Sequence, residues 1–476
     1  MTTYTRASAP RRLPLIGHAA GLRDPLSLLT SLPQYGDLVS LWIGPAHLLI
    51  VCHPDLARDV LTHDRIYDKG GMLYERLREV IGSGVGSCPS DAHRGQRRLV
   101  QPAFHRSRMA GYAAEMTRQL ALESGRWRDG GTLAVYPALT SVTSRIIAKT
   151  LFSSDEITAH TDEFAAAMST MLQSMALRML VPPAWDRLPL PGRHRFQRAR
   201  IRMRHISAQI ITHYRATGID EPDVLSMLLA ARTDIGEPLS DNAIIDEITT
   251  LYLAGTETNA STLSWACHLV AEHPNVQRRL HDEADAVLGR RAATWDDIGQ
   301  LVYTRQIIDE TLRLCPPGWL LTRTATTDAE LGGVPIPRGT TVAVSPYILH
   351  HNPDFWPDPQ TFDPDRWAEP GRPRTDAYVP FAGGARKCLG SNFALAQTTL
   401  SLATIAATWH LESLPGPVHR GIGATLTPNR LRLRLHRHPP GHRHRQPPMP
   451  RNRPALEVSQ ANTSTAGIRD ESQRKG

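Results

Sequence analysis

The segment from Phe381 to Gly390, with the sequence FAGGARKCLG, surrounds one cysteine with residues that suit a metal-bound thiolate. Its glycines permit positive φ angles and a close backbone approach to a flat ligand, so that peptide N–H groups can point at the Cys388 sulfur. These donors and the nearby Arg386 favour the ionised sulfur. A thiolate bound to heme iron promotes cleavage of a bound O–O bond. The alternative is a glycine-rich turn around an inert buried cysteine.

A second unusual segment, AGTET at residues 254–258, lies inside the longest helical pattern of the chain, residues 241–272. Gly costs about 1 kcal/mol relative to Ala in a helix interior, and Thr is also a poor helix former. Helix stability therefore does not explain these residues, and the pattern indicates a specific role for Gly255, Glu257 and Thr258. A kinked helix with a buried threonine is the alternative interpretation.

Two pairs of charged residues recur at helical spacing. Glu310 and Arg313 are three residues apart on a predicted helix that ends before Pro316, so their side chains share one face. His93 and Arg97 are one helical turn apart, and both can reach one carboxylate. Taken singly, these pairs are equally compatible with a surface ion pair and a solvated basic face.

Together, these motifs resemble those of the cytochrome P450 family, in their order and spacing, over about residues 11–436. The resemblance implies that Cys388 is the axial metal ligand of heme b, in a loop that begins at Phe381 and contains Gly384.

The resemblance also implies the roles of other residues. The heme propionates would be bound by His93, Arg97, Arg323 and Arg386. Thr258 and Glu257 would deliver protons. Glu310, Arg313 and Arg366 would form a structural network behind the cysteine loop. Gly255 would leave room for O2. Asn259 departs from the family pattern, which more often has Thr or Ser after the threonine.

The hydrophobic periodicity predicts a mostly α fold with small β-sheets, as in cytochrome P450, with the heme between the long distal helix and the cysteine loop. Hairpin strands are expected over 38–43 and 48–52, a helix over 54–61, and late strands at 340–344 and 431–435. Further helices are expected over 110–128, 138–152, 158–180, 196–215, 241–272 and 275–288. We divide the chain into a flexible N-terminus (1–10), the heme domain (11–436) and a disordered tail (437–476).

The substrate cavity is expected to be apolar. Met168, Met171, Met175 and Met179 form a stripe at helical spacing, which is typical of either core packing or an adaptable cavity wall. The other candidate wall residues are Met72 and Leu73 in a predicted loop, Leu253 and Ala254 on the distal helix, and Trp319 and Leu320.

Composition excludes several other classes of protein. The five cysteines are widely spaced and include no CxxC pair, which argues against a disulfide framework or zinc site and favours a reducing cytoplasm. No apolar run is long enough to span a membrane. Of the net charge of +8, residues 437–476 carry +5, so a nucleic-acid surface is not indicated. The histidines at 436–444 lack regular metal-ligand spacing, and a solvated extension is favoured.

We therefore predict a monooxygenase that inserts one oxygen atom of O2 into a C–H bond of an apolar small molecule. The chain further resembles actinobacterial members of the family that oxidise cyclic terpenes in secondary metabolism, which implies a terpene substrate. It ends soon after the heme domain, so electrons are expected from a separate ferredoxin and ferredoxin reductase. The alternatives are a fatty-acid or polyketide hydroxylase and a heme-thiolate sensor without turnover.

Overall fold

The computed structural model describes residues 3–154, 158–179, 192–219, 221–368 and 375–439. By its internal contacts the chain divides into residues 1–438 and 439–476, and the described helices and strands all belong to the first unit. Within the described residues, none of the helices has both the length and the apolar character needed to cross a bilayer.

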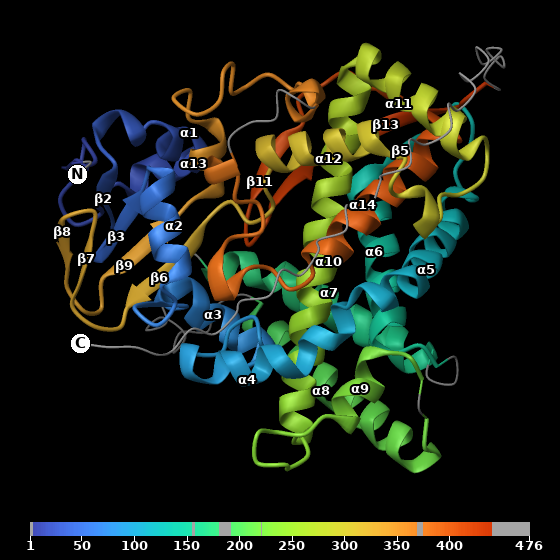
Figure 1. Cartoon of the computed structure of the whole chain (residues 1–476), viewed down its shortest axis with the longest axis horizontal. Coiled ribbons are helices and arrows are strands. Elements are labelled where there is room, and N and C mark those ends of the chain that lie inside the picture. The colour runs from blue at the N-terminus through green and yellow to red at the C-terminus, as the bar shows by residue number, and fades with distance from the viewer. Residues whose placement is uncertain (1–2, 155–157, 180–191, 220, 369–374, 440–476) are drawn as a thin grey trace, which may run out of the picture. The chain divides into compact units, whose positions relative to one another are not determined.

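The fold is mostly helical, with small sheets (Figure 1). The α-helices are α1 Pro25–Thr30, α2 Pro54–Thr62, α3 Gly71–Ile81, α4 Ser90–Val100, α5 Arg106–Ser124, α6 Val135–Leu151, α7 Thr158–Met179, α8 Arg193–Thr217, α9 Val224–Ala230, α10 Asp241–Glu272, α11 Pro274–Leu288, α12 Val302–Leu314, α13 Pro346–His351 and α14 Ser391–Ala406. The strands are β1 Arg6–Ser8, β2 Leu38–Ile43, β3 Ala46–Val51, β4 Tyr67–Asp68, β5 Thr132–Ala134, β6 Leu321–Ala325, β7 Ala329–Leu331, β8 Val334–Ile336, β9 Thr341–Val344, β10 Trp409–Ser413, β11 His419–Ile422, β12 Leu426–Asn429 and β13 Arg432–Arg437.

The largest sheet has the strand order β1-β2-β3-β9-β6-β4 and brings the N-terminal hairpin beside strands about 300 residues later in the chain. Strand β9 pairs in parallel with β3 and antiparallel with β6. At the edge, Asp68 of β4 pairs with Thr324 of β6. This register places the residue that follows Asp68 near Arg323, which is important for the site described below.

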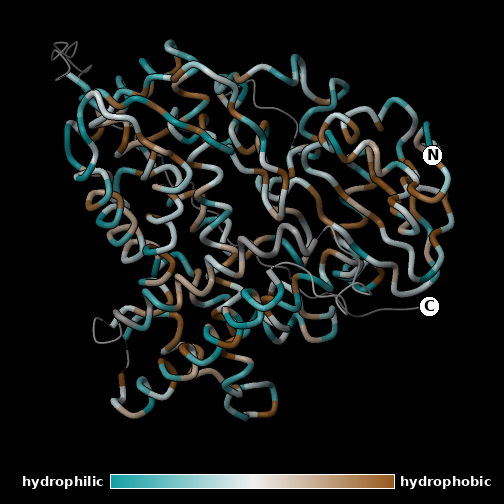
Figure 2. The backbone as a smooth tube through the Cα atoms, turned by 180° about the vertical axis from the view of Figure 1, so that it is seen from behind, coloured by the Kyte–Doolittle hydropathy of each residue, from teal (hydrophilic) through white to brown (hydrophobic). Residues whose placement is uncertain are grey.

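The long helix α10 runs through the helical part of the molecule and packs against α6, α12 and α14 (Figure 1). The Ser240 side chain caps its first turn by accepting a hydrogen bond from the N–H of Ala243. Its end at Glu272 precedes Pro274, which begins α11. Figure 2 shows hydrophobic and hydrophilic residues alternating along most helices, as helices with one buried face require.

The predicted elements are largely present. The hairpin, the helix after Pro54, the long helix at 241–272 and the late strands lie at or within a few residues of their predicted bounds. Two differences are informative. Met72 and Leu73 were predicted in a loop but lie in helix α3. Residues 6–8, within the segment expected to be flexible, form a strand that pairs in parallel with Leu38–Ser40.

Helix α11 contains a buried histidine whose protonation opposes folding. His281 is 7% exposed, binds the carbonyl of Ala406 through Nδ1 at 2.9 Å, and stacks on His438 with ring centroids 3.9 Å apart. Burial, with the neighbouring His438, lowers the pKa of His281 to about 4. Because an unfolded histidine titrates near 6.5, neutral His281 stabilises the fold fully above that pH, and the contribution is lost as the pH falls towards 4.

We expect the free energy of unfolding to fall by about 2 kcal/mol on account of His281 alone between about pH 7.5 and pH 5. Urea unfolding of the protein and of His281→Gln at both pH values tests this. The variant should be less stable at the higher pH, but should lose less stability on acidification. Equal losses in the two proteins would contradict the assignment.

Candidate active site

A cavity of about 420 Å³ lies between helix α10 and the Cys388 loop. Predicted site residues from both sides line it: Cys388 and Phe381 from the loop, Thr258 and Ala254 from α10, and the cations His93, Arg97, Arg323 and Arg386. Its apolar lining includes Val85, Ile147, Leu151, Leu251 and Leu321.

The cysteine loop is folded tightly against its surroundings. The Cys388 N–H donates to the carbonyl of Phe381 at 2.9 Å. Gly384 has a φ of +64°, and a Cβ there would lie 2.3 Å from the carbonyl oxygen of Leu61, so only glycine fits. From α4, the Arg97 guanidinium donates to the carbonyls of Ala385 and Lys387, each at 2.9 Å, and so holds the loop from the other side.

The Cys388 side chain is open to the cavity. Burial raises the pKa of its thiol, while a hydrogen bond from the Gly390 backbone and the charges of Lys69, Arg97 and Lys387 lower it. The backbone donor predicted from the glycines therefore reaches the sulfur. A soft thiolate in this position can ligate heme iron.

Behind the loop, Glu310 and Arg313 form a fully buried ion pair with two contacts, at 2.7 and 2.9 Å. Arg366 joins them, with its Nε 3.4 Å from the Glu310 carboxylate. The structure thus brings the three residues of the predicted network together. Their geometry is structural, since none of the three lines the cavity.

His350 extends this network to the cysteine loop and was not predicted. It is fully buried, and its pKa lies well below the usual value, chiefly because of burial and then because of the charges of His351 and Arg313. The neutral ring contacts the Arg313 carbonyl through Nδ1 and accepts the Val379 N–H at Nε2, at 3.2 and 2.9 Å. The required tautomer therefore carries its proton on Nδ1. A lone histidine in sequence gives no sign of such a bridge.

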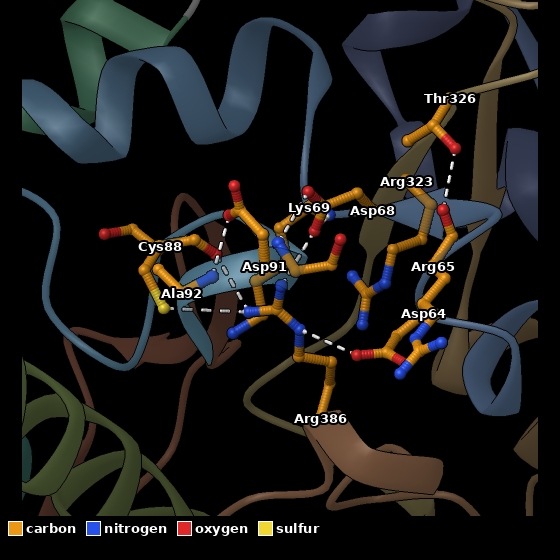
Figure 3. A network of polar contacts seen from close by, with 12 residues as sticks. Asp64, Arg65, Asp68, Lys69, Cys88, Asp91, Ala92, Arg323, Thr326 and Arg386 are labelled. Carbon is orange, nitrogen blue, oxygen red and sulfur yellow. Dashed lines mark hydrogen bonds and ion pairs between the residues drawn. The ribbon is translucent and has the colours of Figure 1, made fainter. Parts of the chain in front are cut away.

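Cations gather at one side of the cavity (Figure 3). Arg386 is buried and is already paired with Asp68 at 2.8 Å and Asp64 at 3.4 Å. Lys69 and Arg323, which was predicted, enter the same space (Figure 3).

Lys69 and Tyr74 were not predicted as site residues, yet both line the cavity beside Arg323. Lys69 donates to the carbonyl of Gly86 at 2.6 Å, and burial lowers its pKa. Arg323 lies 3.4 Å from the Tyr74 hydroxyl. Burial alone would raise the pKa of Tyr74, but Arg323 and Lys69 lower it overall. The β4–β6 pairing that joins these residues has no local signal in the sequence.

These cations fit the carboxylates of heme. Among the described residues, Lys69, Arg97 and Arg323 form no ion pair with a carboxylate. Charges held in a largely buried site need compensation, and the two heme propionates would provide it. His93, which also lines the cavity, has its pKa lowered to about 4 by burial and by the charges of Arg386, Lys69 and Arg97. A propionate would counter the effect of these cations.

On the opposite wall, the residues of α10 that line the cavity follow helical spacing: Thr250, Leu251, Ala254, Gly255, Thr258, Asn259 and Thr262. Thr258 lines the cavity, and its hydroxyl donates to the carbonyl of Ala254 at 2.6 Å. A Cβ on Gly255 would lie 2.3 Å from Cδ1 of Ile147, so the glycine allows α6 to pack closely on α10. Packing therefore accounts for Gly255, which sequence reasoning associated with room for O2.

Glu257 does not line the cavity. It lies near Tyr136, whose pKa is raised by burial and then by the Glu257 charge. Burial likewise raises the pKa of Glu257, and a hydrogen bond with the Thr425 side chain partly offsets this. Glu257, the predicted proton donor, is therefore next to Thr258 on α10, but unlike Thr258 it does not line the cavity.

Of the predicted substrate-wall residues, Ala254 lines the cavity. Leu73, Leu253, Trp319 and Leu320 are partly buried but are not among the lining residues. Met168 and Met171 are fully buried in the main hydrophobic core. The side chains of Met72, Met175 and Met179 lie outside the described part of the structure. Leu253 was predicted to line the cavity but does not, because position 253 is on a different face of α10 from the lining residues.

A cysteine that faces a hydroxyl-bearing helix across a cavity, with cations that have no carboxylate partner among the described residues, fits a heme-thiolate oxygenase. The chain matches the family model described as Cytochrome P450 over residues 8–426, and it belongs to that family of heme-containing monooxygenases.

Relatives and a solved structure agree. The chain is 39% identical to pentalenene oxygenase of Streptomyces avermitilis, over 92% of this chain and 99% of the relative. It is 42% identical to cyclooctatin synthase of Streptomyces melanosporofaciens, over 86% and 90%. It is 39% identical to cyclooctat-9-en-7-ol 5-monooxygenase of the same organism, over 87% and 91%. The crystal structure of the cytochrome P450DA heme domain superposes with a TM-score of 0.81 at 26% identity, covering 92% of this chain and 99% of that one.

Replacing Lys69 should weaken heme retention, because a charge-assisted hydrogen bond is worth about 1.5–3 kcal/mol. We expect Lys69→Met to lose heme to an excess of apomyoglobin at least about tenfold faster than the parent protein. Arg106→Met, which removes an exposed cation outside the cavity lining, is the control and should behave like the parent. Equal heme loss in Lys69→Met and the parent would contradict a role for Lys69 in heme binding.

Proposed function

We propose that this cytochrome P450 hydroxylates a cyclic terpene hydrocarbon in secondary metabolism. The main support is the apolar surface that α6, α10 and β6 present to the cavity, through Ile147, Leu151, Leu251 and Leu321. This surface suits a hydrocarbon without charged groups. The names of its relatives, pentalenene oxygenase and cyclooctat-9-en-7-ol 5-monooxygenase, point to the same substrate class.

The buried cations that line the cavity are expected to bind heme and therefore not to anchor the carboxylate of a fatty acid. A basic group free to bind the substrate carboxylate would favour a fatty-acid hydroxylase. Among the described lining residues the buried cations Lys69 and Arg323 lie together with Arg386, where the heme propionates are expected. We therefore favour the terpene over the fatty acid.

The heme, when bound to Cys388, supplies O2 binding and O–O cleavage. In the overall reaction, R–H, O2, two electrons and two protons give R–OH and water. The protein positions the substrate against the apolar wall and supplies the protons. We assign the last hydroxyl of the proton route to Thr258, which faces the cavity, and the reservoir to Glu257. Burial raises the pKa of Glu257, which favours its protonated form and suits it to hold a proton for delivery.

Family members take their electrons from redox partners, and we propose a separate acidic ferredoxin with its reductase. Lys387 and Arg106 are exposed on the side of the cysteine loop and helix α5, while the nearby Arg98 is already paired with Asp234. Exposed cations favour docking of an acidic partner. Reconstitution tests this, since product formation should require both added proteins and weaken at high salt.

The five cysteines are free thiols, which supports a reducing cytoplasm as the proposed location. Cell fractionation tests it, and recovery of the protein outside the cytoplasm would contradict it.

Titration of the ferric protein with pentalenene tests the substrate class. We expect a saturable optical shift from low to high spin, because an apolar ligand in the cavity displaces water. Palmitic acid at the same concentrations is the comparison, and should give a weaker shift or none. A saturable shift with palmitic acid alone, in protein whose reduced carbon-monoxide spectrum shows thiolate ligation, would overturn the terpene proposal.

Thr258→Ala tests the proton route in the reconstituted enzyme. The variant should form severalfold less product per electron consumed, with the missing electrons recovered as hydrogen peroxide, because the hydroxyl of Thr258 is lost. Thr258→Ser retains a hydroxyl and should keep most of the parent yield. Unchanged yield in Thr258→Ala would exclude the proposed role of this hydroxyl.

A further inference from the structure

Asn259, the residue that departs from the family pattern, makes a contact between the two helices nearest the two sides of the heme site. Its side-chain amide donates two hydrogen bonds, one to the carbonyl of Gly255 and one to Oε1 of Gln397, both at 2.9 Å. Asn259 is 3% exposed and Gln397 is 1% exposed. Gln397 belongs to α14, which begins three residues after Cys388.

The two hydrogen bonds fix the Asn259 side chain completely as a donor. Thr258 uses the same geometry one residue earlier, since its hydroxyl donates to Ala254 four residues before it. Two adjacent side chains therefore bind two adjacent helix carbonyls, and both line the cavity. Of these two side chains, only Asn259 also hydrogen-bonds to α14, so Gln397 ties this turn of α10 to α14, while Thr143 on α6 donates to the carbonyl of Thr256 in the same turn.

Stability alone does not explain the pair. The Nε2 atom of Gln397 is buried and has no hydrogen-bond partner within the described chain. Leaving a buried donor unpaired costs about 1–3 kcal/mol, and two apolar side chains of the same shape would avoid this cost. Hydrogen bonds are directional, whereas apolar contacts are not. The amide pair therefore fixes the geometry between α10 and α14, which an apolar pair would not do.

We propose that Asn259 and Gln397 are positioning residues that hold the Thr258 hydroxyl at a fixed height above the Cys388 sulfur. This inference rests on the proposed role of Thr258. The amide pair joins the turn of α10 that carries the hydroxyl to the helix that directly follows the thiolate loop. Loosening it lets the turn of α10 that carries the hydroxyl move relative to the cysteine loop.

The test uses the heme-loaded enzyme and breaks the pair from each side. Gln397→Met and Asn259→Leu replace the amides with apolar groups of similar size, and Gln397→Glu retains an oxygen acceptor in place. Three properties are measured: product formed per electron consumed, hydrogen–deuterium exchange of the backbone over residues 251–262, and the reduced carbon-monoxide spectrum.

We expect Gln397→Met and Asn259→Leu each to lower product per electron severalfold and to speed exchange in residues 251–262, with an unchanged carbon-monoxide spectrum. The double variant should be no worse than Asn259→Leu, because Asn259→Leu already removes the contact with Gln397 together with the bond to Gly255. Gln397→Glu should restore most of both properties. A merely structural role would alter thermal stability and leave product per electron unchanged.

Parent-like product per electron in both apolar variants, or additive losses in the double variant, would overturn the proposal. If Gln397→Met does not incorporate heme, Asn259→Leu is used instead, because it breaks the contact with Gln397 from helix α10. Thr258→Ala, measured in parallel, separates the two ideas. Loss of coupling in Thr258→Ala with none in the pair variants overturns only the positioning role. No loss in Thr258→Ala overturns the role of the hydroxyl and, with it, the purpose assigned to the pair.

Discussion

The buried ion pair between Glu310 and Arg313 is the interaction on which the cysteine side of the structure depends. Removing both charges from water is costly, and mutual attraction compensates only when every remaining polar atom is also satisfied. The surrounding residues meet this requirement with the backbone carbonyls of His350, Pro359 and Thr361, the backbone N–H of Asp363 and the indole N–H of Trp367. These hydrogen bonds hold segments between residues 350 and 367 around the ion pair. His350 connects them to the cysteine loop by accepting the N–H of Val379.

The residues that line the cavity near Arg386 carry an excess of positive charge. Arg386 has two aspartate partners, while Lys69 and Arg323 have none among the described residues. The described residues therefore supply positive charge in excess of their own carboxylates at this point, and heme propionates would complete the balance. Heme would in this sense stabilise the fold as well as take part in the reaction, because its propionates would offset the cost of burying Lys69 and Arg323.

Sequence reasoning identified contacts that are local. Glu310 and Arg313 lie three residues apart on one helix, and the structure pairs them, whereas in the AGTET segment Thr258 lines the cavity and Glu257 does not. Sequence reasoning failed where contacts join distant segments. Lys69 reaches Arg323 only through the β4–β6 register, and Asn259 reaches Gln397 only through helix packing. Met171 was assigned to the cavity wall from periodicity, but periodicity does not show which buried surface a helix faces.

Gly255 and Ile147 have a consequence for how this active site can evolve. The space that a side chain at 255 would need is occupied by the end of Ile147, and both residues line the cavity. A larger residue at 255 requires the side chain at 147 to move or to become smaller, and a smaller residue at 147 enlarges the cavity beneath α10. The two positions therefore form one evolutionary unit, through which cavity shape can change while the Cys388 loop and the Thr258 hydroxyl stay as they are.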